Sequence, residues 1–246
     1  MSSPQPVAIV TGAAAGIGRA VALRLAKMGL AVAVNYSRSE AEARETLAGV
    51  EAAGARGLLC KANVGDDAAV RSMVARVREE LGGIDVLVNN AGTTRFIDHA
   101  DLEAVTDDDW EQILGVNLKG TFYASRAAGP ALRERGGSIV NVTSVAGLGG
   151  QGSSIPYAAS KAAINCMTKS LARVFAPQVR VNAVAPGPVL TRWLLPHPKM
   201  IERAVSMTPM RRAATPDDIA DTVVFLARGT SLMTGQVVVV DGGLSM

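Results

Sequence analysis

The chain has 246 residues, of which 48% are hydrophobic and 19% are charged, a size and composition that fit one domain and exclude intrinsic disorder. The net charge of +3 is small, and no run of Lys and Arg reaches five, so the sequence does not indicate a nucleic-acid partner. Two cysteines and two histidines are too few for a disulfide framework or a zinc site, and we expect no metal.

Apolar runs of strand length alternate with segments of helical periodicity along the whole chain. In chain order the sequence predicts strand 7–10, helix 17–28, strand 31–34, a helix that starts near 39, strand 57–60, helix 70–81, strand 84–88, helix 107–128, strand 138–142, helix 157–175, strand 179–184, helix 216–228 and strand 236–240. This alternation implies βαβ crossovers and a parallel sheet with helices on both faces. The predicted fold is therefore α/β, one doubly wound sheet of about seven strands, in a single domain over residues 1–246.

Two helix starts carry recognisable signals. Ser39 and Glu42 have the spacing of a capping box. Thr215 is followed by Pro216, which fits an N-cap residue with proline at the first helical position.

The alternation has one long interruption, which ends at residue 212. We interpret residues 188–212 as a substrate lid, because long insertions after a strand often form binding loops. Packing on the core or on a neighbouring subunit is an equally good interpretation of its apolar residues, which are Trp193, Leu194, Leu195, Met200 and Ile201.

Neither a membrane span nor a secretory signal is expected. The longest uncharged stretch, 136–160, is broken by Gly, Asn, Gln, Ser and Pro. The first seven residues lack a basic stretch followed by an apolar run. We therefore expect a cytoplasmic protein with no membrane partner.

A glycine-rich turn lies between the first strand and the first helix. Gly12 would permit the tight turn, Gly16 would let a pyrophosphate approach the backbone, and Gly18 would let the helix pack closely on the strand. The helix start also offers free N–H groups and the positive end of its dipole to phosphates. Ordinary tight turns use glycine too, but the position after the first strand favours a dinucleotide site of the Rossmann type.

The end of the second strand bears on which dinucleotide binds. Sites for NAD usually carry an acidic residue there, which holds the ribose 2′-hydroxyl. Here the strand ends in Asn35, and Ser37 and Arg38 follow it, with Glu40 as the first acid. Arg38 could pair with a 2′-phosphate through charge-assisted hydrogen bonds, or it could be a solvated loop cation. We predict NADP(H) in preference to NAD(H).

Tyr157 and Lys161 share one face of a predicted helix. A free phenol has a pKa of about 10, and a nearby ammonium lowers that pKa toward the range in which general acid–base catalysis works. Ser144 ends the fifth strand, where its hydroxyl could reach a substrate oxygen. Taken singly, a surface Tyr–Lys pair and a turn-forming serine are the more common interpretations.

Together these motifs resemble the short-chain dehydrogenase/reductase family over essentially the whole chain. The resemblance rests on the turn 11–18, on Asn-Asn-Ala-Gly at 89–92, on Pro-Gly at 186–187, and on the tetrad Asn117, Ser144, Tyr157 and Lys161. It implies that Tyr157 exchanges the proton, that Lys161 lowers its pKa and holds the nicotinamide ribose, that Ser144 orients the carbonyl, and that Asn117 holds a water of a proton relay.

The resemblance also implies the cofactor contacts. They are Gly12, Ala14, Gly16, Ile17, Gly18, Ser37, Arg38, Asn63, Val64, Asn90, Ala91, Gly92, Pro186, Gly187, Val189 and Thr191, with Tyr157 and Lys161 on the nicotinamide side. Asn63 departs from the Asp that many members carry there. The family usually pairs the helices 107–128 and 157–175 between subunits, which implies a homodimer or homotetramer.

Within the family, the sequence is most similar to the 3-oxoacyl-[acyl-carrier-protein] reductases at residues 34–37, 62–64 and 234–243. Arg135 would suit an acidic carrier protein near the mouth of the site, but Pro177 and Gln178 stand where a second Arg is usual, so an acyl carrier protein stays doubtful as a partner. Relatives that act on other small ketones, quinones, sugars or steroids share these stretches. A non-catalytic nucleotide-binding regulator is a further alternative, although such a protein would be expected to lose Tyr157 or Lys161.

Overall fold

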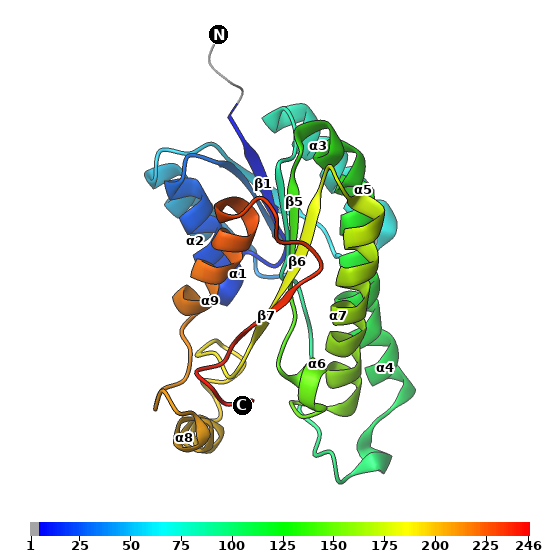
Figure 1. Cartoon of the computed structure of the whole chain (residues 1–246), viewed down its shortest axis with the longest axis vertical. Coiled ribbons are helices and arrows are strands. Elements are labelled where there is room, and N and C mark those ends of the chain that lie inside the picture. The colour runs from blue at the N-terminus through cyan, green and yellow to red at the C-terminus, as the bar shows by residue number, and fades with distance from the viewer. Residues whose placement is uncertain (1–4) are drawn as a thin grey trace.

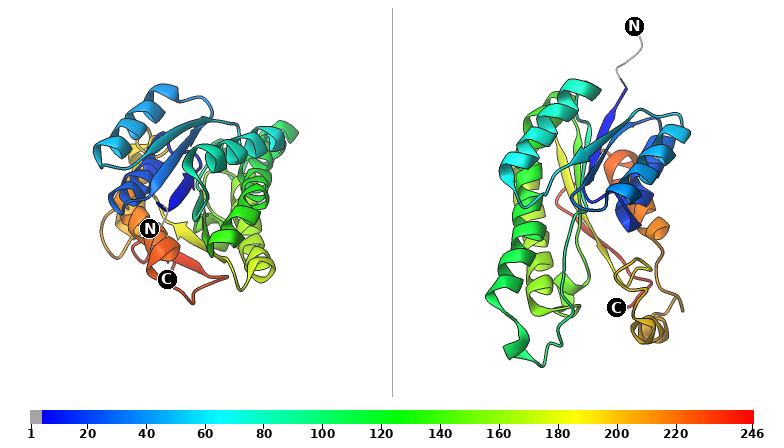
Figure 2. Two further views of the ribbon diagram at one scale, coloured as in Figure 1. Left: turned by 90° about the horizontal axis from the view of Figure 1, so that it is seen from above. Right: turned by 180° about the vertical axis from the view of Figure 1, so that it is seen from behind.

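The computed structural model of the chain describes residues 5–246; the first four residues, part of the segment in which we expect no secretory signal, lie outside it. Within the described residues, seven strands form one fully parallel sheet in the order β3-β2-β1-β4-β5-β6-β7 (Figures 1 and 2). The strands are β1 Val7–Val10, β2 Ala31–Tyr36, β3 Gly57–Lys61, β4 Val86–Asn89, β5 Ser138–Val142, β6 Arg180–Pro186 and β7 Val237–Val240. The predicted doubly wound α/β sheet is thereby confirmed.

Helices cover both faces of the sheet (Figures 1 and 2). One face carries α1 Gly16–Lys27, α2 Glu40–Ala52 and α9 Pro216–Val224, and the other carries α3 Asp67–Leu81, α5 Gly120–Arg135 and α7 Ile155–Phe175. Because parallel strands are buried on both sides, successive residues of β1 enter opposite cores. Val7 and Ile9 pack with α3, α5 and α7, whereas Ala8 and Val10 pack with α1, α2 and α9.

The direction of winding reverses between β1 and β4. From β1 the chain proceeds outward through β2 to β3, then returns to place β4 on the other side of β1. The carboxyl ends of β1 and β4 therefore diverge at a topological switch point, where open α/β sheets bind their ligands.

Several helices differ from their predicted extents. The predicted helix 107–128 is α4 Asp107–Ile113, a π-helical segment Leu114–Lys119 and α5, which continues to Arg135. Two helices were not predicted: α6 Ala146–Gly149 after β5, and α8 Pro198–Met207 inside the long interruption. Polar and proline residues in that interruption obscured the amphipathic pattern of α8.

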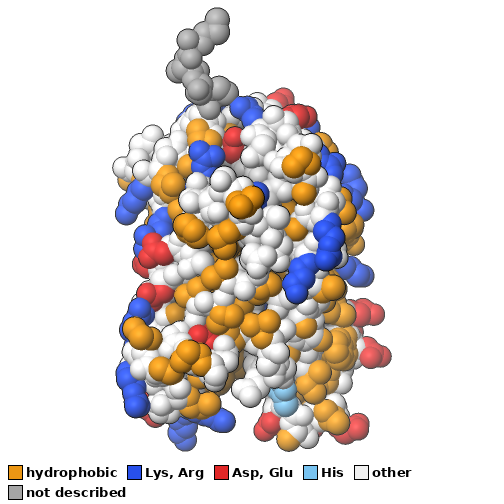
Figure 3. Space-filling model, in the orientation of Figure 1, with side chains coloured by type: hydrophobic (Ala, Val, Ile, Leu, Met, Phe, Trp, Pro, Cys, Tyr) orange, Lys and Arg blue, Asp and Glu red, His pale blue; other side chains and the backbone are white. Residues whose placement is uncertain are grey.

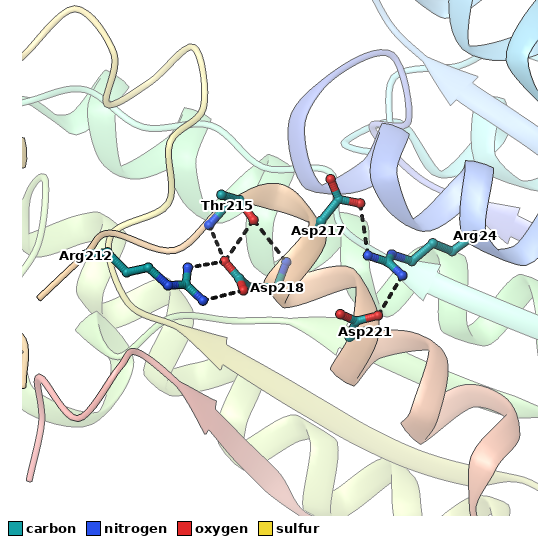
Figure 4. A network of polar contacts seen from close by, with 6 residues as sticks. All are labelled: Arg24, Arg212, Thr215, Asp217, Asp218 and Asp221. Carbon is teal, nitrogen blue, oxygen red and sulfur yellow. Dashed lines mark hydrogen bonds and ion pairs between the residues drawn. The ribbon is translucent and has the colours of Figure 1, made fainter. Parts of the chain in front are cut away.

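Of the two predicted helix caps, the one at Thr215 is confirmed and the one at Ser39 is not. Thr215 caps α9 in a complete capping box: its hydroxyl accepts from Asp218 N at 3.3 Å, and Asp218 Oδ2 accepts from Thr215 N at 2.7 Å (Figure 4). The capping box predicted at Ser39 is wrong, because the Ser39 side chain makes no cap hydrogen bond. Its hydroxyl instead accepts from Arg192 Nη1 at 3.1 Å.

Neighbouring ion pairs reinforce the start of α9. Arg212 binds both carboxylate oxygens of Asp218, at 2.6 and 2.7 Å, and this pairing, followed by the Thr215 N–H, holds the pKa of Asp218 far below its usual range. Arg24 of α1 bridges Asp217 and Asp221, which fastens α9 to α1 (Figure 4).

We expect Thr215→Ala to lower the free energy of unfolding by about 1 kcal/mol, the usual cost of losing an N-cap hydroxyl. Ser39→Ala is the matched control and should change it by much less, since Ser39 does not cap α2. Urea unfolding of both variants at neutral pH measures the difference. Equal losses in the two variants would contradict the assignment of the cap.

Candidate active site

The glycine-rich turn after β1 is held in place by two asparagines. Asn90, just after β4, donates from Nδ2 to the carbonyls of Thr11 and Gly12, at 2.9 and 3.0 Å. Asn35, at the end of β2, accepts from Gly12 N at 3.1 Å and donates to the carbonyls of Cys60 and Ala62. The Thr11 hydroxyl accepts from the backbone N–H groups of residues 90 and 91. The turn is thus tied to the ends of three other strands.

The turn has no space for side chains at Gly12 and Gly18. A Cβ on Gly18 would collide with the carbonyl oxygen of Gly12, and one on Gly12 would lie 2.9 Å from Ala91 Cα. Helix α1 begins at Gly16 with no side-chain cap and no acidic residue in its first turn. Its free N–H groups therefore face a cradle of bare backbone, which fits a pyrophosphate. The dinucleotide predicted from the sequence suits these residues.

Ser37 and Arg38 lie at the rim of this cradle, where β2 ends. Both are exposed, and within residues 5–246 the Arg38 side chain makes no hydrogen bond or ion pair. The nearby acid, Glu40, is already engaged by Arg44 at 2.7 Å, which lowers the pKa of that carboxyl. A free guanidinium with no competing carboxylate can pair with a phosphate added from solution.

The loop after β5 and the start of α7 bring Ser144, Tyr157 and Lys161 together. Ser154 caps α7 by accepting from Tyr157 N, which places Tyr157 in the first helical turn and Lys161 in the second. The Ser144 hydroxyl lies close enough to the Tyr157 phenol to lower its pKa. The Lys161 ammonium lies 5.6 Å from the centre of the Tyr157 ring and donates to the Val142 carbonyl at 2.9 Å.

Close backbone packing fixes this group. A Cβ on Gly147 would lie 2.5 Å from the carbonyl carbon of Lys161, so only glycine lets α6 rest directly on α7 at this point. The Ser144 hydroxyl oxygen accepts from Ala146 N at 3.1 Å. Its own O–H is therefore the group that can donate, to Tyr157 or to a ligand.

Burial shifts the pKa values of Tyr157 and Lys161. It raises the pKa of Tyr157 to about 12, an effect that the hydrogen bond with Ser144 partly offsets, and it lowers the pKa of Lys161 to about 8. The role predicted for Lys161, lowering the pKa of Tyr157, stays a prediction, since burial and the neighbouring Ser144 set that pKa in this arrangement. Near pH 7 the phenol keeps its proton and Lys161 is mostly charged.

Asn117 is fully buried inside the π-helical segment Leu114–Lys119. Its Oδ1 accepts from Thr93 N at 2.8 Å, and its Nδ2 donates to Thr93 O and to Ser160 Oγ. These bonds join the loop after β4 to α7, next to Lys161. The side chain is occupied with positioning, and the water-holding role implied by the family stays a prediction.

The chain after β6 returns over both parts of the site. Thr191 lies against the phosphate cradle: a Cβ on Gly16 would be 3.3 Å from its methyl group. Trp193 meets Tyr157 edge to face, with 6.4 Å between ring centres, and also covers Gly92. Farther along, His197 packs on Phe96 with 4.6 Å between ring centres.

The other predicted cofactor residues are mostly framework. Ala14 and Val64 are buried, and Ile17 packs against the core. Pro186 ends β6, and Val189 pairs with Ala214. Asn63 is exposed and accepts from Gly65 N.

Arg135 does not line the mouth of the site within this chain. It precedes β5, whereas Ser144 follows that strand, so the two residues lie at opposite ends of the sheet. Its guanidinium donates to the Gly82 carbonyl at 2.6 Å. The expectation that Arg135 lies near the mouth is wrong for the chain's own site.

The supporting roles of Asn35, Thr11 and Ser160 are not predicted from the sequence. Asn35 stands where an NAD site carries an acid, yet it is almost fully buried and supports the cradle. A buried strand that ends in an amide was the available signal, since a buried amide needs partners. Ser160 lies within the Tyr–Lys spacing and gave no separate signal.

Comparisons with known proteins agree with this geometry. The family model described as enoyl-(acyl carrier protein) reductase matches residues 12–245. A protein of Streptomyces violaceoruber described as ketoacyl reductase 2 of the granaticin polyketide synthase is 46% identical over 242 residues, which is 97% of this chain and 95% of that one. This chain belongs to the short-chain dehydrogenase/reductase family. It is therefore an oxidoreductase.

Two further members of the family are similar throughout. The 3-oxoacyl-[acyl-carrier-protein] reductase FabG of Staphylococcus aureus is 40% identical over 97% of this chain and 98% of its own length. The crystal structure of a short-chain dehydrogenase from Burkholderia cenocepacia in complex with NADP has a TM-score of 0.92 at 36% identity, covering 99% of each chain.

Within residues 5–246, no group of three or more His, Cys, Asp or Glu side chains is placed to hold a metal ion. No helix in that range combines the length and the apolar character needed to cross a bilayer.

The proton affinity of Tyr157 can be measured directly. In the protein without added nucleotide, we expect the Tyr157 phenol to ionise well above pH 10, because burial raises its pKa to about 12. Phenolate absorbance during an alkaline titration, taken as the difference between the unmodified protein and Tyr157→Phe, reports this one group. A midpoint near pH 7 would contradict the burial argument.

Proposed function

We propose that this protein is an NADP(H)-dependent reductase that transfers a hydride to a ketone carbonyl, with 3-oxoacyl thioesters as the leading substrate class. One observation carries the proposal: the hydroxyl groups of Ser144 and Tyr157 neighbour each other, and the buried Lys161 ammonium lies 5.6 Å from the centre of the Tyr157 ring. Two neighbouring O–H donors suit a carbonyl oxygen, whose charge increases during reduction.

In this proposal Tyr157 donates its proton to the carbonyl oxygen as the hydride reaches the carbonyl carbon. Ser144 donates a second hydrogen bond to the same oxygen and holds it in place. Lys161 has further N–H donors beside its bond to Val142, and these would hold the ribose hydroxyls of the cofactor. NADPH, when bound, supplies the hydride. Asn117 keeps the loop after β4 and the helix of Tyr157 in register.

The choice of NADP(H) is supported by the end of β2. Asn35 is turned inward to the cradle and no acid is free to hold a ribose 2′-hydroxyl, whereas Arg38 is exposed and unpaired within residues 5–246. The relative from Burkholderia cenocepacia was solved with NADP. Cofactor contacts by the residues predicted from the sequence belong to the same proposal, as does a lid over residues 188–212.

The substrate class is supported by the relatives rather than by the pocket. Two of them carry names of ketoacyl reductases. The family model carries the name of an enoyl reductase, a reaction that delivers its proton to carbon. The paired hydroxyls favour protonation of an oxygen, and hence the keto substrate. Trp193 and Phe96, both partly exposed beside the site, would cover the acyl chain.

The test is NADPH oxidation with a panel of an acetoacetyl thioester, a crotonyl thioester, a diketone, a quinone, an aldose and a steroid ketone. We expect turnover of the acetoacetyl thioester and a loss of about 10²- to 10⁴-fold in Tyr157→Phe, the usual contribution of a general acid. Tyr123→Phe, which changes a tyrosine outside the site, should keep full turnover.

Other outcomes of the panel are informative. Turnover of another class, with the thioester inert, would replace the substrate but keep the mechanism. Full turnover by Tyr157→Phe would overturn the mechanism. Nucleotide binding without any turnover would favour the non-catalytic regulator.

We also propose that the protein is a cytoplasmic homo-oligomer, a tetramer or a dimer. Strand β7 is an edge strand, and Val239, Leu232 and Phe225 leave 41, 91 and 49% of their surface exposed near it. Hydrophobic side chains gather over the face that carries β7 (Figure 3). A bare apolar edge favours pairing with another copy. Two free cysteines, one of them exposed, support a reducing compartment.

Light scattering measures the assembly. We expect a mass of two or four chains, which Val239→Asp should reduce, because it places a charge on the β7 edge. Ser206→Asp, on the exposed face of α8, is the control and should leave the mass unchanged. A monomer mass for the unmodified protein would contradict the proposed oligomer.

A further inference from the structure

Arg192 makes a contact that neither the fold nor the tetrad requires. Its Nη1 donates to the Ser39 hydroxyl at 3.1 Å, across 153 positions of sequence. Arg192 belongs to the segment after β6, and Ser39 belongs to the loop after β2. The contact therefore crosses the carboxyl edge of the sheet, from the side of the proposed lid to the rim of the cofactor cradle.

The neighbouring residues fix where this crossing occurs. Thr191 lies against Gly16, the first residue of α1, at the phosphate cradle. Ser39 directly follows Arg38 and precedes α2. The backbone at 191–192 thus runs from the expected position of the pyrophosphate to the expected position of the adenosine ribose of a dinucleotide.

The arginine side chains at this point have no acidic partners. Within residues 5–246, neither Arg38 nor Arg192 forms an ion pair, although both are exposed. Glu40 is engaged by Arg44, and Glu45 by Arg19. Ser39 does not cap its helix, so its hydroxyl is available to orient a ligand. Two guanidinium groups without acidic partners and a hydroxyl, on loops that touch through Arg192 and Ser39, suit a dianion such as a phosphate monoester.

We propose that Arg192 is a second ligand for the 2′-phosphate of NADP(H), which it binds together with Arg38 and Ser39. The inference rests on the proposed function and assigns cofactor selectivity to the segment after β6 as well as to the loop after β2. A contact with the pyrophosphate, which NADH also carries, is the competing role for Arg192, and the two roles differ in a measurable way.

The experiment is direct titration of NADPH and NADH, by the fluorescence of the bound nicotinamide, into the unmodified protein, Arg192→Ala and Arg38→Ala. We expect Arg192→Ala to bind NADPH about ten-fold more weakly, a factor that corresponds to about 1.4 kcal/mol, and to bind NADH almost as before. Arg38→Ala should show the same pattern. Arg173→Ala, which removes an exposed arginine near the end of α7, is the matched control and should change neither affinity.

Two further readouts separate the 2′-phosphate from other causes. The fragment 2′,5′-ADP, which lacks the nicotinamide, should compete less well in Arg192→Ala, whereas 5′-AMP should compete equally. Arg192→Lys should retain part of the selectivity, because it keeps the charge but loses the fork. Far-ultraviolet circular dichroism should confirm that each variant is folded.

Equal losses for NADPH and NADH in Arg192→Ala would overturn the inference and assign Arg192 to the pyrophosphate. Unchanged affinities would overturn it too and leave Arg192 as a surface cation. In both cases the proposed function stands as long as the unmodified protein prefers NADPH. An unmodified protein that binds neither nucleotide, or prefers NADH, would overturn the proposed function and the inference together.

Discussion

The site depends on the contact between the loops that leave β1 and β4. At this switch point the backbone of Gly12 comes so close to Ala91 that no side chain fits between them, and the amide of Asn90 satisfies two carbonyls of the turn. A buried carbonyl without a partner costs free energy, so these bonds fix the shape of the turn as well as its position. The phosphate cradle is consequently part of the sheet rather than a flexible loop on top of it.

The second constraint is the burial of Lys161. Lys161 is only 4% exposed and its ammonium has one backbone acceptor, so desolvating that charge is costly, as the lowered pKa indicates. In the proposed function, the cofactor ribose supplies the further acceptors. Asn117 and Gly147 hold the surrounding backbone close, so the ammonium has little freedom to move into solvent. The buried Lys161 charge lowers local stability, and it places an ammonium next to the Tyr157 phenol.

Much of this was predictable from the sequence, and the failures have physical causes. Strand positions followed from apolar runs, since strands buried on both faces are mostly apolar. Thr215 and Asp218 formed the expected cap, whereas Ser39 did not, because a tertiary partner, Arg192, took its hydroxyl. Spacing predicted that Tyr157 and Lys161 share a face, but not that burial would dominate the pKa of the phenol. Arg135 was misplaced because sequence proximity to a strand does not say which end of the sheet a residue occupies.

Three consecutive residues after β6 have a consequence of their own. Thr191 touches the cradle, Arg192 touches Ser39, and Trp193 touches Tyr157. Because the three residues are consecutive, a shift of this backbone would change all three contacts. Ligands at the two ends of the cleft would then be thermodynamically linked, and each would change the affinity of the other by the same factor. The order in which cofactor and substrate bind would thus affect the rates of binding. The total free energy of forming the ternary complex would be the same for either order.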